Sequence, residues 1–308
     1  MAPKRVDQME AKLGTLHLLE IDVRHACETS KNGSNSTSKP IAVLQHDLTD
    51  TWDTTIDQLF SILAAEDTPA IGLKLDFKSI EAAEIGIATL SALLNQESPK
   101  SQRFKQNIKI IWLNADVIAL DPVAPNPPVA LDPFLQVCQN VLPNASLSLG
   151  WAVSAQTHRD IGQMIDQYCS MRNGVGRNGT IDKMTAEQAA LLRLMLNSVH
   201  QINEIYKHRV AKETHVTFPV RAGLLCLPDF IEMLARFVNE EPSRKSVTLW
   251  HKNEDSCCHN DTDHNNKSHY SKKAHFYSQQ IATLRGALPT TAHMLYDLPD
   301  DIRHAIRR

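Results

Sequence analysis

Three carboxylates in this sequence stand near the ends of short apolar segments. Glu20 and Asp22 are two residues apart in "LHLLEIDV", and Asp76 lies in "GLKLDFKS" between Lys74 and Lys78. Successive strand side chains point to opposite faces, so residues two apart share a face. Convergent carboxylates repel each other, and hard cations such as Mg²⁺ or Ca²⁺ prefer their oxygens as ligands. The spacing therefore predicts a site for one divalent cation, with Glu20, Asp22 and Asp76 as ligands.

A second interpretation of the same residues needs no metal. Charged groups are costly to bury unless they are paired, and lysines on the same strand face can pair with carboxylates. Under this interpretation Glu20, Asp22 and Asp76 form salt bridges at the rim of a sheet. If a cation is bound instead, Lys78 adds a fixed positive charge beside it, and we expect Lys74 to line the site.

Other polar and aromatic residues stand at the ends of neighbouring apolar segments. His46 ends "VLQH", and an imidazole near a metal serves as a general acid or base near pH 7. Asn114 and Asp116 share a face in "WLNADV" and are candidates for the substrate pocket. Arg221 is suited to holding a phosphate or a carboxylate, and Trp250 to forming a pocket wall. Structural roles in the core or in rim ion pairs remain open for all five.

The segments that carry these residues alternate between strand-like and helix-like patterns. Strands are predicted over 16–23, 41–46, 71–77, 108–117, 145–151, 215–222, 246–251 and 292–298. Helices are predicted over 53–66, 81–95, 185–208 and 227–238, the third opening with the capping box Thr185-x-x-Gln188. Repeated strand-helix units favour an α/β fold with a parallel sheet, and about seven units favour a (β/α)8 barrel.

The chain is predicted to form a single domain over residues 1–308 with three long polar insertions. The insertions cover 28–40, 171–183 and 251–273, which are rich in turn-forming residues and lack periodicity.

Composition narrows the class of protein. The chain has 308 residues, 42% of them hydrophobic and 22% charged, and a net charge of −3, so no general affinity for nucleic acid or membrane surfaces is expected. No apolar run approaches the roughly 20 residues of a spanning helix. The first residues, "MAPKRVDQMEAKLG", lack the apolar centre of a signal peptide, which predicts a cytoplasmic protein. Six Asn-x-Ser/Thr sequons would suit a secreted or extracellular protein if the N-terminus were incomplete.

Taken in order, eight motifs resemble those of the menorin-domain family. They read "EIDV", "LQHD", "GLKLDFKS", "IWLNADV", "LSLGW", "VTFPVRA", "VTLWH" and "LYD", and they span nearly the whole chain. The family is similar to phospholipase-C-like and glycerophosphodiesterase-like barrels. The resemblance implies that Glu20, Asp22 and Asp76 bind the metal, that Lys78 faces a phosphate and that His46 is catalytic. It also implies that Trp250 lines the pocket, and that the ligand is a small phosphodiester or lysophospholipid-like molecule.

One family feature is not found. The family pattern begins with a strand that ends in a histidine, "H-A-x-N", ahead of the glutamate, and this sequence has no such motif before Glu20. The expectation is a barrel without its first strand and with one catalytic histidine missing. The predicted function is a metal-dependent phosphodiesterase-like protein that is weakly active or inactive. The alternative is a non-catalytic binding or signalling barrel that keeps the metal pocket.

Overall fold

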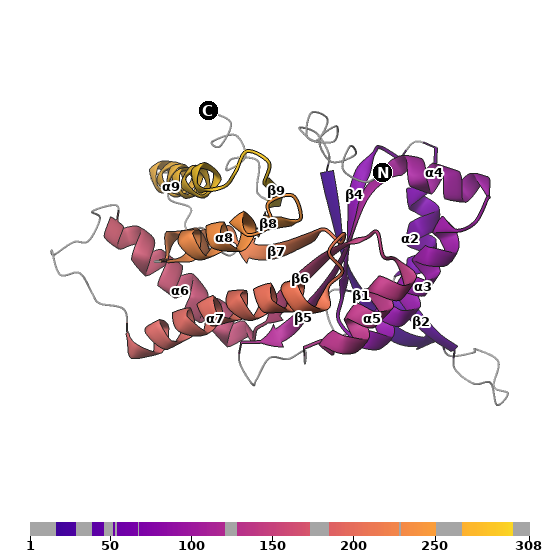
Figure 1. Cartoon of the computed structure of the whole chain (residues 1–308), viewed down its shortest axis with the longest axis horizontal. Coiled ribbons are helices and arrows are strands. Elements are labelled where there is room, and N and C mark those ends of the chain that lie inside the picture. Colours follow the sequence, from indigo (N-terminus) through magenta and orange to yellow (C-terminus); the bar gives the residue numbers. More distant parts are fainter. Residues whose placement is uncertain are drawn as a thin grey trace. The chain divides into compact units, whose positions relative to one another are not determined.

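The structure is a computed structural model (Figure 1). It describes residues 17–28, 39–45, 52, 54–66, 68–120, 128–172, 185–227, 229–250 and 267–297. The chain divides into two compact units. Unit 1 comprises residues 1–117 and 128–148, and unit 2 comprises 118–127 and 149–308. The single-domain assignment of residues 1–308 stays a prediction.

Unit 1 is built on parallel strands with one antiparallel hairpin. Its strands are β1 (His17–Glu28), β2 (Lys39–Leu44), β3 (Thr54–Thr55), β4 (Ile71–Phe77) and β5 (Ile108–Ala119). Their order is β3-β2-β1-β4-β5, with β4 parallel to both β1 and β5 and β2 antiparallel to β1. The first half of β1 pairs with β4 and its second half with β2, so β1 extends beyond the parallel sheet into the hairpin.

Helices cover the apolar face of this sheet. They are α2 (Ile56–Leu63), α3 (Ile80–Leu94), α4 (Pro99–Asn107) and α5 (Leu131–Val141). Leu73, Leu75 and Phe77 of β4 are fully buried, and the ring of Phe77 lies 6.2 Å from that of Phe134 on α5. A Cβ on Gly86 of α3 would come within 2.8 Å of the Phe77 ring, so the close approach of helix and strand requires glycine. The even-numbered residues of β4 are thereby left to the opposite face of the sheet.

Unit 2 repeats the alternation of strands and helices. Its strands are β6 (Ser146–Ala152), whose first three residues belong to unit 1, β7 (Val216–Arg221), β8 (Lys245–Trp250) and β9 (His293–Asp297). Their order is β6-β7-β8-β9, and β8 is parallel to both β7 and β9. The helices are α6 (Ala155–Arg172), α7 (Ala186–Arg209), the 3-10 turn η2 (Ala222–Cys226), α8 (Phe230–Asn239) and α9 (Lys267–Ala287).

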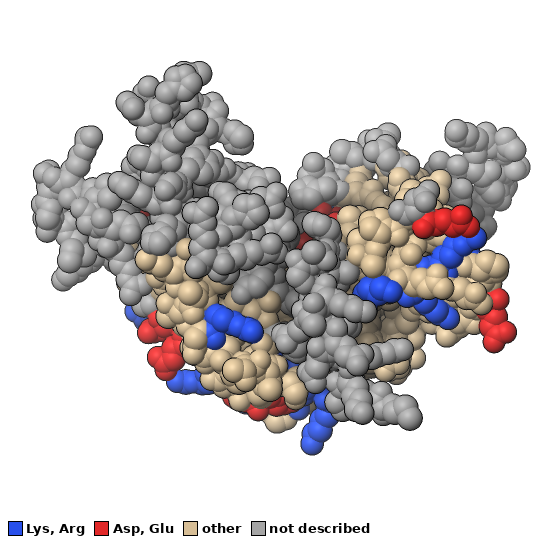
Figure 2. Space-filling view, turned by 90° about the horizontal axis from the view of Figure 1, so that it is seen from above, with Lys and Arg blue, Asp and Glu red and all other residues tan. Residues whose placement is uncertain are grey.

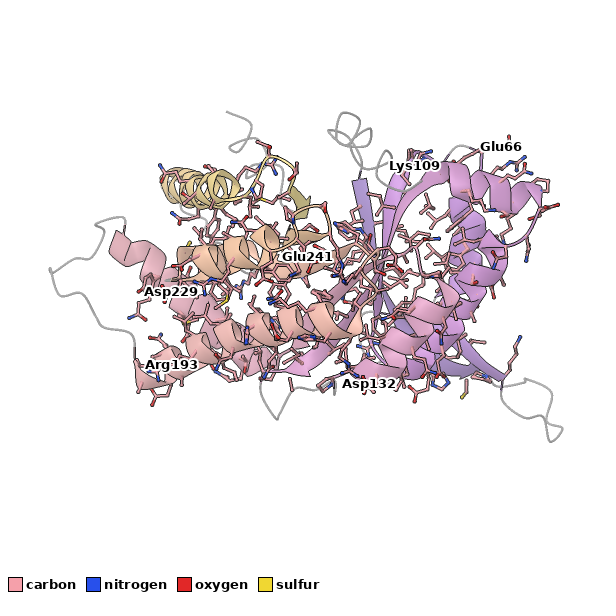
Figure 3. All side chains as sticks on the ribbon, in the orientation of Figure 1. Glu66, Lys109, Asp132, Arg193, Asp229 and Glu241 are labelled. Atoms are coloured by element: carbon pink, nitrogen blue, oxygen red, sulfur yellow. The ribbon has the colours of Figure 1, made fainter. Side chains whose placement is uncertain are left out.

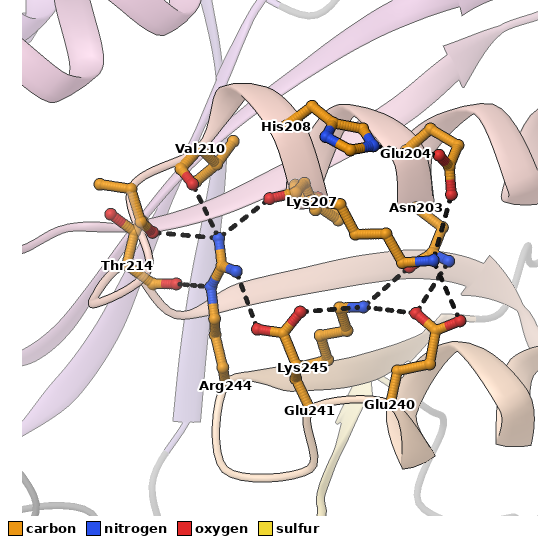
Figure 4. Close-up of polar contacts among 12 residues, drawn as sticks. Asn203, Glu204, Lys207, His208, Val210, Thr214, Glu240, Glu241, Arg244 and Lys245 are labelled. Carbon is orange, nitrogen blue, oxygen red and sulfur yellow. Dashed lines mark hydrogen bonds and ion pairs between the residues drawn. The ribbon is translucent and has the colours of Figure 1, made fainter.

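Hydrogen bonds and ion pairs of two buried cationic side chains, Arg244 and Lys245, connect the ends of α7 and α8 to the start of β8 in unit 2 (Figure 4). Lys245 is fully buried, contacts Glu240 at 3.0 Å and Asn203 at 2.8 Å, and lies 5.3 Å from the centre of the Phe237 ring. Arg244 donates hydrogen bonds of 2.9 to 3.1 Å to four backbone carbonyls, those of Tyr206, Val210, Ala211 and Thr214. Since the last carbonyls of a helix lack intrahelical donors, Arg244 stabilises the C-terminal end of α7.

The α/β class and the alternation of mostly parallel strands with helices are confirmed. All eight predicted strands are present, and "IGLKLDF" coincides with β4 at both ends. Both Thr55 of α2 and Thr185 of α7 form complete capping boxes, with Gln58 and Gln188 respectively. The helices α4, α5, α6 and α9 and the short strand β3 were not predicted.

The three predicted insertions are described only at their ends. Glu28 belongs to β1, Lys39 and Pro40 to β2, residues 171–172 to α6 and residues 267–273 to α9. The remaining residues of the insertions lie outside the described part of the chain.

The surface carries charges of both signs. On the face in Figure 2, the described acidic and basic side chains lie near one another around its edges, which fits the net charge of −3. Among the helices that the structure describes, none combines the length and apolarity needed to cross a lipid bilayer.

Candidate functional site

The register of β1, β4 and β5 aligns the predicted site residues in two rows. Glu20 pairs with Lys74 in one row, and Asp22, Asp76 and Asn114 follow one another in the next. Neighbours in register on parallel strands point their side chains to the same face. The face opposite the apolar core of unit 1 therefore carries charged or polar groups from all three strands, as the two-residue spacing predicted.

A β-bulge brings β5 into this arrangement. Ile71 pairs with Ile108, but Gly72 pairs with Ile110, so β5 has one additional residue at this point. This residue is Lys109, which is labelled in Figure 3. A bulge of one residue changes which side chains of the strand share a face with the partner strand. Beyond Lys109, the polar residues of β5 face the same side as Asp76.

Two lysines pair with three carboxylates at the site. Lys74 Nζ lies 2.7 Å from Glu20 Oε1. Lys78 Nζ lies 2.7 Å from Asp22 Oδ1 and 2.6 Å from Asp76 Oδ2, so one ammonium group bridges two carboxylates. Burial opposes the charge of Lys78, but the carboxylates of Asp76 and Asp22 outweigh it and raise the pKa of the lysine. Lys78 is therefore a permanent cation between Asp22 and Asp76.

Asn114 orients Asp76 and leaves one acceptor unused. Its Nδ2 donates a 2.8 Å hydrogen bond to Asp76 Oδ1, while Lys78 contacts the other carboxylate oxygen. Asn114 is buried, and its Oδ1 has no hydrogen-bond partner within the described residues. An unsatisfied buried carbonyl costs free energy, so Oδ1 is an acceptor suited to a cation or a donor.

Asp116 follows two residues later on β5 and is half-buried. Burial, followed by the negative charge of Asp76, raises the pKa of its carboxyl to about 7, although Lys78 and Lys74 act in the opposite direction. The carboxyl group of Asp116 therefore changes its protonation state near neutral pH.

The cluster has more acidic than basic groups. The described residues of the cluster comprise four carboxyl groups, those of Glu20, Asp22, Asp76 and Asp116, and two ammonium groups, those of Lys74 and Lys78. With every group ionised, these six groups carry a net charge of −2, and the charge of Asp76 adds to burial in raising the pKa of Asp116. One divalent cation would balance the charge.

The fit of the residues to a metal ion is partial. Asp22 and Asp76 converge on one cationic nitrogen at 2.7 and 2.6 Å, close to the roughly 2.3 to 2.6 Å of Ca²⁺–oxygen bonds. Glu20 pairs with Lys74 instead, and no three His, Cys, Asp or Glu side chains of the described chain converge as a metal-ligand set. Two of the three predicted ligands fit a shared cation position, and the metal assignment itself stays a prediction.

The other predicted site residues are Arg221, Trp250 and His46. Arg221 and Trp250 end β7 and β8 in unit 2, where they are partners in register. Arg221 is buried and donates a 3.3 Å hydrogen bond to the carbonyl oxygen of His158. His46 lies outside the described residues, so its catalytic assignment stays a prediction.

Sequence reasoning placed Lys78 toward a phosphate, and its bridging contacts were not predicted. The "D-x-K" spacing contains the signal, because residues two apart on one strand face are within pairing distance. The bulge at Lys109 was also missed, since an isolated lysine at a strand start gives no sequence signal.

The chain is similar to a known protein family. The model of the menorin N-terminal domain matches residues 4–277, which is most of the chain. No solved structure gives a significant match. The matched region contains every residue of the charged cluster, and the chain belongs to the menorin family.

Proposed function

We propose that this menorin-family protein binds one divalent cation, Mg²⁺ or Ca²⁺, and a small phosphodiester or lysophospholipid-like ligand at the charged face of β1, β4 and β5. The observation that carries the proposal is the convergence of Asp22 and Asp76 on a single cation position, occupied by Lys78 Nζ at 2.7 and 2.6 Å. The excess of negative charge and the unused oxygen of Asn114 support it.

The proposed chemistry is that of a metal-dependent phosphodiesterase with low turnover. A bound divalent cation would polarise a phosphoryl oxygen. Lys78 is suited to stabilising negative charge on the phosphate, and Asp116 to transferring a proton near pH 7. His46 is the proposed second acid or base, on the likeness to the family alone. Lys74, Arg221 and Trp250 are proposed to line the substrate pocket.

The proposed architecture around this site is a (β/α)8-type barrel. The alternation of parallel strands with helices supports it, as does the resemblance of the family to barrel phosphodiesterases. In such barrels the active site lies at the carboxyl ends of the strands. Asp22, Asp76 and Asp116 approach the carboxyl end of the parallel region of their strands, which is where the proposed chemistry needs them.

A second candidate function is a non-catalytic binding protein. The observation that favours it is that Lys78 already pairs with both Asp22 and Asp76, so that each carboxylate has a cationic partner without a metal. In that case the acidic face recognises a cationic or phosphate-bearing ligand without turnover.

Calorimetric titration of the full chain with Mg²⁺ and Ca²⁺ tests the proposal. We expect one binding site in the wild type and a loss of affinity of about tenfold or more in Asp76→Asn, since one charged ligand is removed. Asp57→Asn changes an exposed carboxylate on α2 and should bind like the wild type.

Turnover is measured on a lysophospholipid and a glycerophosphodiester, with Mg²⁺ or with chelator. Slow hydrolysis that chelator abolishes is expected. Unchanged affinity in Asp76→Asn would refute the metal site. Cation binding without any hydrolysis would favour the non-catalytic candidate.

A further inference from the structure

We infer that Lys78 is a built-in competitor of the divalent cation. Its ammonium group holds the position between Asp22 and Asp76 and must leave when a cation binds. This inference rests on the cation site of the proposed function and assigns that site a regulatory residue. It follows from distances within unit 1 and from the charges of the described cluster.

The two cations cannot occupy the site together. Lys78 Nζ contacts Asp22 Oδ1 at 2.7 Å and Asp76 Oδ2 at 2.6 Å, close to the roughly 2.3 to 2.6 Å at which Ca²⁺ contacts carboxylate oxygens. A divalent ion bound to the same two oxygens would overlap the ammonium group. Like charges in so small a space also repel strongly in a partly buried site.

Only the side chain of Lys78 has to move. Its backbone N–H donates a 3.0 Å hydrogen bond to the Val23 carbonyl, and the next residue, Ser79, is the N-cap of α3. The backbone is therefore fixed at this position. The side chain is 19% exposed, and its flexible four-carbon stem gives the ammonium group a route to solvent.

The other lysine of the cluster has a different role. Lys74 pairs with Glu20, which is more exposed than Asp22 and Asp76, and no contact of Lys74 with these two aspartates is described. Displacement of Lys78 removes an ammonium partner that Asp22 and Asp76 share, whereas displacement of Lys74 removes a partner of Glu20 alone. The cation affinity of the site is therefore set mainly by Lys78.

Release of Lys78 would also link cation binding to ligand binding. Once displaced, the ammonium group loses two carboxylate partners and needs another anion nearby. A phosphate group of the ligand meets that need, because Lys binds phosphate as a point charge. Cation and phosphate ligand are then expected to bind cooperatively, each favouring the displaced lysine.

The experiment compares Ca²⁺ and Mg²⁺ binding by the full-length wild type, Lys78→Met, Lys78→Arg and the control Lys100→Met. Lys100 is exposed on α4 and contacts only Ser61 among the contacts described. Removal of the competing charge should raise the divalent affinity of Lys78→Met by about tenfold or more, because charge-assisted hydrogen bonds no longer have to break. Lys78→Arg keeps a cation and should stay as weak as the wild type.

Each outcome decides a different statement. Equal or weaker binding by Lys78→Met overturns the competitor role, while binding by the wild type leaves the proposed cation site intact. Binding by Lys78→Met alone supports the competitor role and refutes a working metal site in the natural protein. Absence of binding in all variants overturns both.

Thermal unfolding of each variant, with and without Ca²⁺, tests the same inference when a variant is only marginally folded. Lys78→Gln keeps a polar side chain in the same place and serves as the second neutral variant. Ca²⁺ should raise the unfolding temperature of Lys78→Met and Lys78→Gln by more than that of the wild type, since a ligand stabilises the state that binds it. Equal shifts in all proteins would refute the competitor role independently of calorimetry.

Discussion

Asp116→Asn should stabilise the protein at neutral and alkaline pH. The pKa of the Asp116 carboxyl rises from its ordinary value of 3.8 to about 7 in the folded state, through burial and then the charge of Asp76. Between these two values the folded protein holds a proton that the unfolded chain has released. The free energy of unfolding therefore falls as the pH rises from about 4 to about 7, and it levels off above that range.

The size of this stabilisation follows from the shift in the pKa of Asp116. A shift of about three pKa units corresponds to about 4 kcal/mol of unfolding free energy, at roughly 1.36 kcal/mol per unit. Asp116 is half-buried, and contact with water reduces the penalty, so about 2 to 3 kcal/mol is a realistic expectation. The asparagine variant carries no titrating group and avoids this penalty. Its advantage over the wild type should be largest at pH 8 and close to zero at pH 4.

Urea unfolding of both proteins between pH 4 and pH 8 measures this difference directly. Comparing variant with wild type at each pH cancels the titration of all other groups. Asp57→Asn, at an exposed position, should follow the wild type throughout. Parallel curves for Asp116→Asn and the wild type would refute the reasoning. If a cation binds, added Ca²⁺ should reduce the difference in unfolding free energy between Asp116→Asn and the wild type, because a nearby positive charge lowers the pKa of Asp116.

Two further predictions concern the buried charges of unit 2. Lys245→Met leaves Glu240 without its buried partner and should lower the free energy of unfolding by about 3 kcal/mol. Lys207 is an exposed partner of the same carboxylate, at 3.2 Å, and Lys207→Met should lower the free energy of unfolding by less than about 1 kcal/mol. Arg244→Lys cannot reach four carbonyls and should cost about 2 to 3 kcal/mol by denaturant unfolding. Equal costs for Lys245→Met and Lys207→Met, or a neutral Arg244→Lys, would contradict these assignments.

Sequence patterns predicted the strands well because several are buried on both faces and have the sequence of short apolar runs. β4 is the clearest case, since every residue of Ile71–Phe77 is buried and the predicted and observed ends agree. The helices that escaped prediction have weak patterns. In α4, "PKSQRFKQN", only Phe104 is a buried apolar residue, so no apolar stripe marks the helix.

The sequence predicted which residues lie at the site, but it did not predict which of them pair with each other. Two-residue spacing placed Glu20 and Asp22 on one face, and the structure agrees. Whether Lys78 faces a ligand or bridges two aspartates depends on distances across strands, which spacing along one strand does not contain. The same holds for Asn114, whose contact with Asp76 depends on the register of β4 against β5.

The bulge at Lys109 has a consequence for how this strand can change in length. With Ile71 paired to Ile108, an unbulged β5 would set Leu113 beside Asp76 and turn Asn114 and Asp116 toward the helices. Deletion of Lys109 would therefore remove the bulge and keep Asn114 beside Asp76. Loss of a second residue would shift β5 by one position and exchange its polar and apolar faces. The start of β5 can thus lose one residue, but not two, without turning the site residues toward the helices, whatever ligand the site binds.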